Sequence, residues 1–196
     1  MANVDGPFGF RPVRMLSGSA YTGASVSCAI AAAYGTRLGV GDPVQLAGSS
    51  VDGAPTISRA AAGGPVFGII VGFEPTRSDL TLQYSPATTA GVAMVCADPN
   101  VVFEVQDDGG GALDGDAVGL NADFIAGNCS TSTGRSIYEL DGGTTTAPAT
   151  TADLPLKIVG QRNSPDNDLD ADFAVWEVTL NKSELVADAT GLSAGI

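Results

Sequence analysis

The amino-acid sequence predicts an all-β protein: a β-barrel or sandwich of short strands, with an extended N-terminal arm and few short helices. The chain of 196 residues contains 26 glycines and 11 prolines, and its short apolar runs end repeatedly at turn-forming residues. The segment around Trp176 alternates, which is the period of a strand: Ala174, Trp176, Val178 and Leu180 share one face, and Phe173, Val175, Glu177 and Thr179 share the other. Apolar stripes at helical spacing do not extend beyond two turns, so helices should be few.

The expected elements follow one another in the order arm, body and tail. Residues 1–35 are expected to form the arm, in which residues 17–33 are either a second part of the arm or contain a short helix near residues 28–34. Residues 36–185 are expected to form the β-rich body, and residues 186–196 a C-terminal tail. Apolar runs closed by Gly, Pro, Asn or Asp predict strands at residues 40–46, 66–73, 92–97, 101–106, 117–125, 136–140, 156–160 and 172–180, with a turn at 49–53 and an exposed loop at 141–153.

The opening segment, GPFGFRPVR at residues 6–14, is expected to be extended. Its two prolines remove backbone donors and its two glycines loosen the chain, so neither a helix nor a central strand fits. The same nine residues hold aromatic and arginine side chains, the types that gain most from a pocket. The candidate partner contacts are Phe8, Phe10, Arg11 and Arg14. Alternatively, the arm folds back on its own body and the two aromatic rings cap the core.

The charge distribution disfavours nucleic acid and anionic membranes as partners. The chain has 9 Lys and Arg against 22 Asp and Glu, a net charge of −13. Residues 1–41 hold three arginines and one aspartate, net +2, so the remaining residues carry −15. Neutralising phosphates requires clustered cations, and these are scattered. The sequence has neither a signal-peptide pattern nor an apolar run of about 20 residues, so we expect synthesis in a cytoplasm and no membrane partner.

Catalytic chemistry is not expected. The chain has no histidine, which removes Ser-His-Asp triads and histidine-ligated metals, and neither Lys157 nor Lys182 lies in a Ser-x-x-Lys motif. Carboxylate pairs for glycoside hydrolysis are conceivable among Glu74, Glu104, Glu139 and Glu177. The clefts of such enzymes are usually rich in aromatic residues, and this chain has one Trp and four Tyr. We therefore expect no enzyme and no cofactor.

One acidic segment has the ligand spacing of a calcium-binding loop. Its candidate ligands are Asp166, Asp168, Asp170 and Asp172. Ala171 stands where the sharp turn of such a loop requires glycine, and a strand rather than a helix follows. The expected structure is therefore a solvated turn without metal, with bound calcium as the alternative. The three widely spaced cysteines form no zinc pair and are expected to be buried, with an intermolecular disulfide as the alternative.

Three segments resemble the head decoration, or cement, proteins of tailed bacteriophages: residues 6–14, the VGDPV of residues 40–44 and the ADPNVVFEVQ of residues 97–106. The resemblance implies a non-enzymatic virion protein on the capsid exterior, made in the host cytoplasm. Such a protein binds the assembled shell and stabilises it by clamping neighbouring major capsid subunits. It implies trimers or dimers, of which we expect a homotrimer. The four candidate contacts of the opening segment would then touch the shell.

Two other functions remain open. A tail or head-to-tail connector subunit would share the β-rich build but assemble with itself into rings or tubes. A virion-displayed sugar-binding module would grip cell surfaces through loops such as residues 141–153, and binding of glycans by the isolated protein would favour it.

Overall fold

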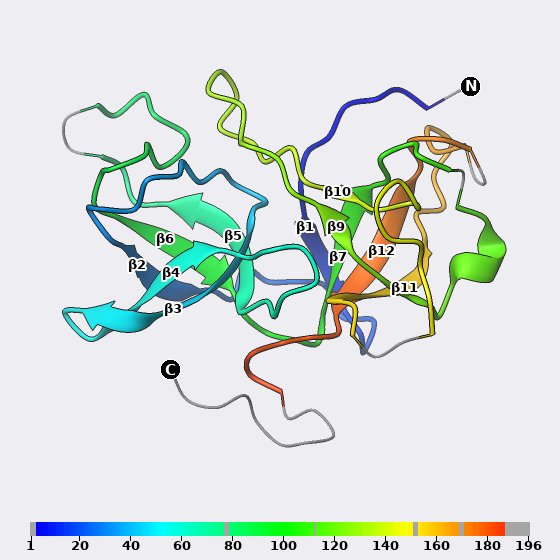
Figure 1. Ribbon diagram of the computed structural model, residues 1–196, viewed down its shortest axis with the longest axis horizontal. Coiled ribbons are helices and arrows are strands. Elements are labelled where there is room, and N and C mark those ends of the chain that lie inside the picture. The colour runs from blue at the N-terminus through cyan, green and yellow to red at the C-terminus, as the bar shows by residue number, and fades with distance from the viewer. Residues whose placement is uncertain (1–2, 77–78, 112, 151–152, 169–170, 187–196) are drawn as a thin grey trace.

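The computed structural model describes residues 3–76, 79–111, 113–150, 153–168 and 171–186. This described part is almost entirely β, which confirms the fold class predicted from the sequence. The strands form two lobes that lie side by side (Figure 1). We call them the barrel lobe, built from β2 to β6 and their connections, and the sheet lobe, built from β1 and β7 to β12.

The barrel lobe is a closed five-stranded barrel with the strand order β2-β4-β3-β5-β6. Its strands are β2 (Val26–Ile30), β3 (Pro43–Val51), β4 (Ala54–Arg59), β5 (Gly68–Phe73) and β6 (Gly91–Cys96). Strand β2 closes the barrel because it pairs antiparallel with β6 and, at Ala29 and Thr56, parallel with β4. Buried aliphatic residues such as Ile30, Val44 and Ile57 fill the interior.

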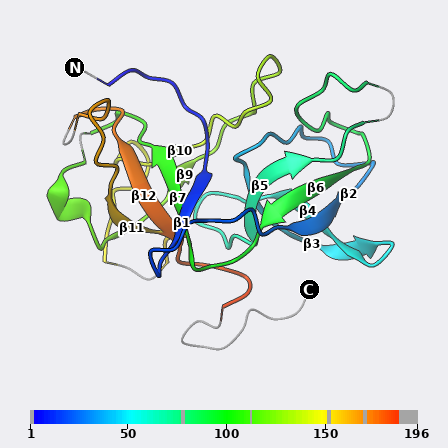
Figure 2. The same ribbon diagram turned by 180° about the vertical axis from the view of Figure 1, so that it is seen from behind.

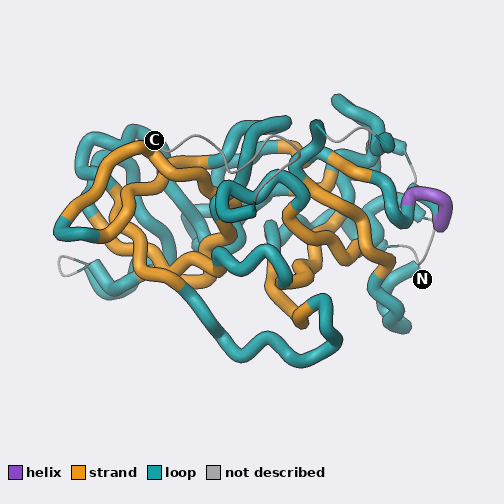
Figure 3. Tube along the Cα trace, turned by 90° about the horizontal axis from the view of Figure 1, so that it is seen from below, coloured by secondary structure: helices purple, strands orange, loops and turns teal. Residues whose placement is uncertain are grey.

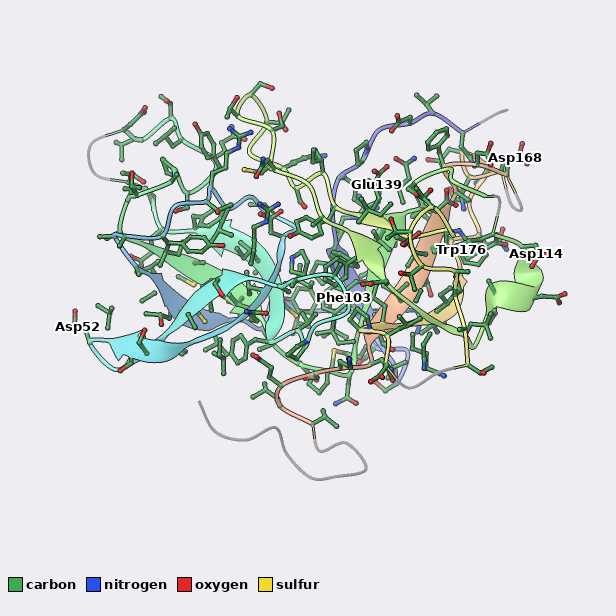
Figure 4. The ribbon with its side chains drawn as sticks, viewed as in Figure 1. Asp52, Phe103, Asp114, Glu139, Asp168 and Trp176 are labelled. Carbon is green, nitrogen blue, oxygen red and sulfur yellow. The ribbon has the colours of Figure 1, made fainter. Side chains whose placement is uncertain are left out.

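A hairpin of β3 and β4 projects from the barrel, with Asp52 at its tip (Figure 4). Asp52 and Gly53 both have positive φ, 51° and 81°, which is the backbone of a two-residue type I′ turn. The turn predicted at residues 49–53 is therefore confirmed in its last two residues, whereas β3 continues through Val51.

The sheet lobe contains an antiparallel five-stranded sheet in the order β1-β7-β12-β11-β8 and a two-stranded sheet of β9 and β10. Its elements are β1 (Arg11–Met15), β7 (Val101–Gln106), the 3-10 helix η1 (Gly115–Ala117), β8 (Asn121–Ala122), β9 (Phe124–Ile125), β10 (Glu139–Leu140), β11 (Leu156–Gln161) and β12 (Val175–Leu180). Trp176 and Val178, on one predicted face of β12, are fully buried, but Val175 and Thr179 on the other face are buried as well, so burial does not alternate along this strand. In Figure 3, η1 lies at the outer end of this lobe.

Strands β1 and β7 are neighbours in the sheet, although the whole barrel lies between them in the sequence. The chain starts in the sheet lobe, leaves it to build the barrel, and returns at β7 (Figure 2). The edge of the sheet therefore depends on a pairing between segments far apart in sequence, which is costly in loop entropy until the barrel has formed.

Residues 1–35 do not form the separate arm expected from the sequence. Within them, β1 is an edge strand of the sheet lobe, and β2, at the place of the optional short helix, closes the barrel. Proline is compatible with β1 because an edge strand donates hydrogen bonds on one side only. The single body expected at residues 36–185 is likewise two lobes, and residues 186–196 lie outside the described residues apart from Val186.

The opening segment passes between the lobes at a point of close backbone approach. Gly9 has φ 72°, and a Cβ on it would lie 2.3 Å from the Cβ of Ser136 and 2.8 Å from the carbonyl oxygen of Gly41. The next amide, Phe10 N, donates to that same Gly41 oxygen at 3.0 Å. The Phe10 ring is 2% exposed and packs edge-on against Phe124 in the core of the sheet lobe.

A second link between the lobes is the side chain of Arg59, at the end of β4. Its Nε donates to the hydroxyl of Tyr138 at 2.9 Å, and its two terminal nitrogens donate to Asn128 Oδ1 and to the carbonyl of Gly127. The guanidinium also lies 5.3 Å from the centre of the Tyr138 ring. One barrel side chain thus holds three groups of the connection between β9 and β10.

Apolar contacts join the lobes as well. Val66, Ile69 and Cys96 of the barrel lobe belong to the same buried cluster as Phe103 and Trp176 of the sheet lobe. Because this cluster crosses the junction, we expect the two lobes to unfold in one cooperative transition.

Replacing Gly9 by alanine is expected to destabilise the protein by about 3 kcal/mol or more, because the methyl group collides with Ser136 and with backbone. Gly18 is the matched control, since it has φ 86° and a Cβ on it would have no atom within 4 Å. Gly18→Ala should therefore cost only the strain of the left-handed backbone, about 1 kcal/mol. Urea unfolding measures both, and equal losses would contradict the close approach.

Replacing Arg59 by alanine is expected to lower the free energy of unfolding by about 2–4 kcal/mol, because three acceptors at the junction lose their donor. Arg59→Lys should recover less than half, since one ammonium group cannot reach all three. Lys157→Ala, at an exposed site on β11, should stay within about 0.5 kcal/mol. Denaturant unfolding compares the three variants; an Arg59→Ala curve matching that of Lys157→Ala would refute the link.

Candidate functional site

A cleft with a volume of about 460 Å³ lies between the two lobes. The opening segment contributes Phe8, Phe10, Arg11 and Pro12, the connection after β1 contributes Tyr21 and Gly23, and the remaining lining residues are Val40, Ile70, Val71 and Arg135. Its size falls within the roughly 300–1,000 Å³ typical of ligand-binding pockets. The lining combines aromatic and aliphatic side chains with two arginines.

The wall formed by the opening segment is held in place by side-chain contacts. Phe8 is half-buried, and the guanidinium of Arg11 lies 5.2 Å from the centre of its ring. Arg11 also pairs with Glu104 of β7, which is its cross-strand partner. These contacts fix an aromatic ring and a cation together at the rim of the cleft.

The arginines of β1 neutralise two glutamates of the sheet. Glu104 and Glu177 lie directly opposite each other on β7 and β12, an arrangement of like charges that would be destabilising alone. Arg11 and Arg162 contact Glu104, and Arg14 contacts Glu177. Two of the glutamates considered for glycoside hydrolysis are therefore partners in ion pairs.

The structure places the four residues predicted as partner contacts in different surroundings. Phe10 is buried in the core, so its side chain does not reach a partner, as the alternative of an opening segment folded back on its own body predicts for this ring. Arg11 and Arg14 are both ion-paired within the chain and both keep exposed side-chain surface, so their contact with a partner stays a prediction. Phe8 and Arg11 line the cleft.

The lining of the cleft also includes Arg135, which is not among the contacts predicted from the sequence. Its backbone is fixed: the carbonyl accepts from Ser130 N at 2.9 Å, and the residue forms a parallel bridge with Val40. Its side chain is exposed, and within the described part of the chain no carboxylate forms an ion pair with it. A lone arginine in a Ser- and Thr-rich loop gives no sequence pattern that would identify it.

Two further lining residues, Tyr21 and Val71, add uncharged surface to the cleft. Burial is the main cause that raises the pKa of Tyr21, so this side chain is a neutral phenol at neutral pH, and its hydroxyl donates to the carbonyl of Ala24 at 2.7 Å. Val71 lies at an irregularity in the pairing of β5 with β6, between Ile70 and Gly72. Such a bulge re-aims a side chain, and Val71 lines the cleft.

The three cysteines, Cys28, Cys96 and Cys129, are buried and unpaired, as their interpretation as small buried side chains predicts. Burial raises the pKa of the Cys28 and Cys129 thiols to about 11. Both are therefore protonated at neutral pH, which keeps them unreactive.

The candidate calcium loop is held by amide side chains. Asn167 is buried and bonds the backbone of Val175 and Arg162, while Asn3 bonds the backbone of Asp168. Asp166 pairs with Arg162, and Asp170 lies outside the described residues. No group of three or more metal-ligating side chains gathers anywhere in the described part of the chain, so Asp166, Asp168 and Asp172 are not brought together.

Next to this loop, Asp107 is an internal anchor. Its carboxylate, fully buried, accepts from the amides of Gly109, Phe173 and Ala174 and from the indole nitrogen of Trp176, at 2.8–3.2 Å. Burial raises its pKa, and these four donors lower it in part. The carboxyl group of Asp107 thus ties β7 to the start of β12.

Glu139 on β10 faces several other carboxyl groups. Burial raises the pKa of Glu139 to about 7, and Asp5, Asp108 and Asp107 add to the effect. Because the raised pKa favours the protonated form in the folded state, folding is weakened as the pH rises from about 4.5 to 7.

Comparison of the chain with protein-family models, curated proteins and solved structures gives no match. Among the residues that the structure describes, no helix is long and apolar enough to cross a membrane.

Replacing Glu139 by glutamine is expected to stabilise the protein at pH 8 by about 1–2 kcal/mol, after discounting for solvent screening. At pH 4.5 the two proteins should be equally stable, because the glutamate is then protonated in the folded state. Thermal unfolding across this pH range measures the difference, with Glu74→Gln on an exposed residue as control. A difference independent of pH would contradict the raised pKa.

Proposed function

We propose that this chain is a structural protein of a tailed-bacteriophage head, which binds the outer surface of the assembled capsid and stabilises it by clamping neighbouring major capsid subunits. The resemblance of residues 6–14, 40–44 and 97–106 to decoration proteins supports the proposal. Parts of two of these segments line the cleft: Phe8 and Arg11 of residues 6–14, and Val40 of residues 40–44.

The observation that carries the proposal is the cleft itself. A protein that stabilises a shell by binding benefits from a concave surface that is already formed in the free protein. If the surface became ordered only on binding, the entropy lost would weaken the affinity. Here the shared core and the Arg59 contacts hold the two sides of the cleft in place. Aromatic and arginine side chains on its walls are the types enriched at the energetic centres of interfaces.

The acidic body is compatible with this role. A net charge of −13 keeps the free protein soluble and leaves it little affinity for nucleic acid. We propose that it acts as a homotrimer, because several copies held together cross several capsid subunits, and rupture of one contact is then resisted by the others.

The test is to add the full chain to expanded phage shells stripped of accessory proteins. We expect saturation at a fixed ratio to capsid subunits and a rise in the melting temperature of the shell, because a ligand of the assembled state stabilises it by mass action. Co-sedimentation and a thermal scan measure the two quantities.

Shells that still carry their accessory proteins are the control, since their sites are occupied and binding should be lost. Deletion of residues 1–14 is unsuitable as a control, because it removes most of β1 and the buried Phe10. Absence of binding to the stripped shells would refute the proposal, and self-assembly into rings or tubes would favour a tail or connector subunit instead.

A further inference from the structure

The cleft has a charge opposite to that of the rest of the protein. The chain has 9 basic residues against 22 acidic ones, yet two arginines, Arg11 and Arg135, line this one cleft. Arg11 already has Glu104 as a partner. Arg135 is exposed and, among the described residues, has no ion pair, so its five donors are available to a ligand.

The surroundings of these arginines are apolar. Phe8, Tyr21 and Val71 lie on the same lining, and Tyr21 is a neutral phenol at neutral pH. Apolar walls exclude water from a cation and strengthen its attraction for a carboxylate. They also offer burial to aliphatic side chains on either side of that carboxylate.

We propose that the cleft binds an extended segment of a partner protein that carries a carboxylate side chain flanked by aliphatic residues, with the carboxylate on Arg135. The inference rests on the proposed function, in which the partner is the capsid subunit. The guanidinium of Arg135 takes the carboxylate by two parallel hydrogen bonds, and the flanking side chains pack on Phe8, Tyr21 and Val71.

A peptide suits this cleft better than a phosphate polyanion. Glu104 lies beside Arg11 at one wall and neutralises it, which leaves one unpaired cation rather than a cluster. One guanidinium matches one carboxylate, whereas nucleic acid requires many phosphates to be neutralised together by a protein whose net charge is −13.

The probe is a capped pentapeptide, acetyl-Ala-Leu-Glu-Leu-Ala-amide, titrated into the full-length protein and followed by backbone amide chemical shifts. We expect shifts at the amides of Phe8, Tyr21, Val71 and Arg135. The matched peptide with glutamine in place of glutamate should bind about tenfold more weakly, because it lacks the charge-assisted bonds.

Arg135→Gln should weaken binding of the glutamate peptide about tenfold and abolish the preference over the glutamine peptide. Its side chain has no described ion pair in the fold, so the variant should fold normally. Lys157→Gln, which removes the same charge from an exposed site on β11, is the matched control and should bind as the unaltered protein does. Equal binding of both peptides, shifts away from the cleft, or no binding would overturn the inference.

The same variants added to stripped expanded shells separate the inference from the proposed function. Loss of shell binding with Arg135→Gln but not with Lys157→Gln supports both. Shell binding that survives Arg135→Gln overturns the assignment of the cleft and leaves the capsid function standing. Peptide binding without any shell binding overturns the capsid function and leaves the cleft as a binding site for acidic segments.

Discussion

The passage of the opening segment between the two lobes is the constraint on which the rest of the structure depends. Gly9, Gly41 and Ser136 approach so closely that no Cβ fits on Gly9, and the amide that follows is bonded to Gly41. From this point Phe10 enters the core of the sheet lobe and β1 pairs with β7. Phe8 and Arg11, on either side of it, are thereby placed on the cleft. The close approach at Gly9 therefore helps to fix the position of Phe10 in the core, the pairing of β1 at the edge of the sheet, and the part of the cleft lined by the opening segment.

The cleft keeps its shape because the lobes are joined by two kinds of contact. The shared apolar cluster supplies most of the burial, but apolar contact is not directional and would tolerate small shifts of one lobe against the other. The hydrogen bonds of Arg59 to Tyr138, Asn128 and Gly127 are directional, and they fix the connection between β9 and β10 that continues back from Tyr138 to Arg135. Arg59 of the barrel lobe therefore helps to hold the connection that carries Arg135.

Much of the body could be predicted from the sequence, because its strands are apolar runs with clear ends. The expected strand at residues 101–106 is β7 itself, and the expected strand at residues 172–180 contains β12. β1 was missed because Pro12 excludes a central strand, and sequence alone does not identify a partner strand about 90 residues away that needs only an edge. The expected strand at residues 117–125 became β8 and β9, separated by Asp123, whose carboxylate accepts the amides of Gly63 and Phe124. Arg135 could not be predicted, since its role arises only where two lobes meet.

The opposite charges of the body and the cleft restrict the kind of partner that fits. A protein with net charge −13 repels a strongly acidic surface at long range, and that repulsion is screened within about 8 Å at physiological ionic strength. A carboxylate therefore reaches Arg135 more readily from a surface that is otherwise neutral or basic. Salt weakens both the pairing at Arg135 and the approach of the acidic protein to a basic surface. A shell surface with isolated carboxylates among aliphatic and basic residues offers a partner to Arg135 without repelling the protein, whereas a uniformly acidic surface offers carboxylates but repels it.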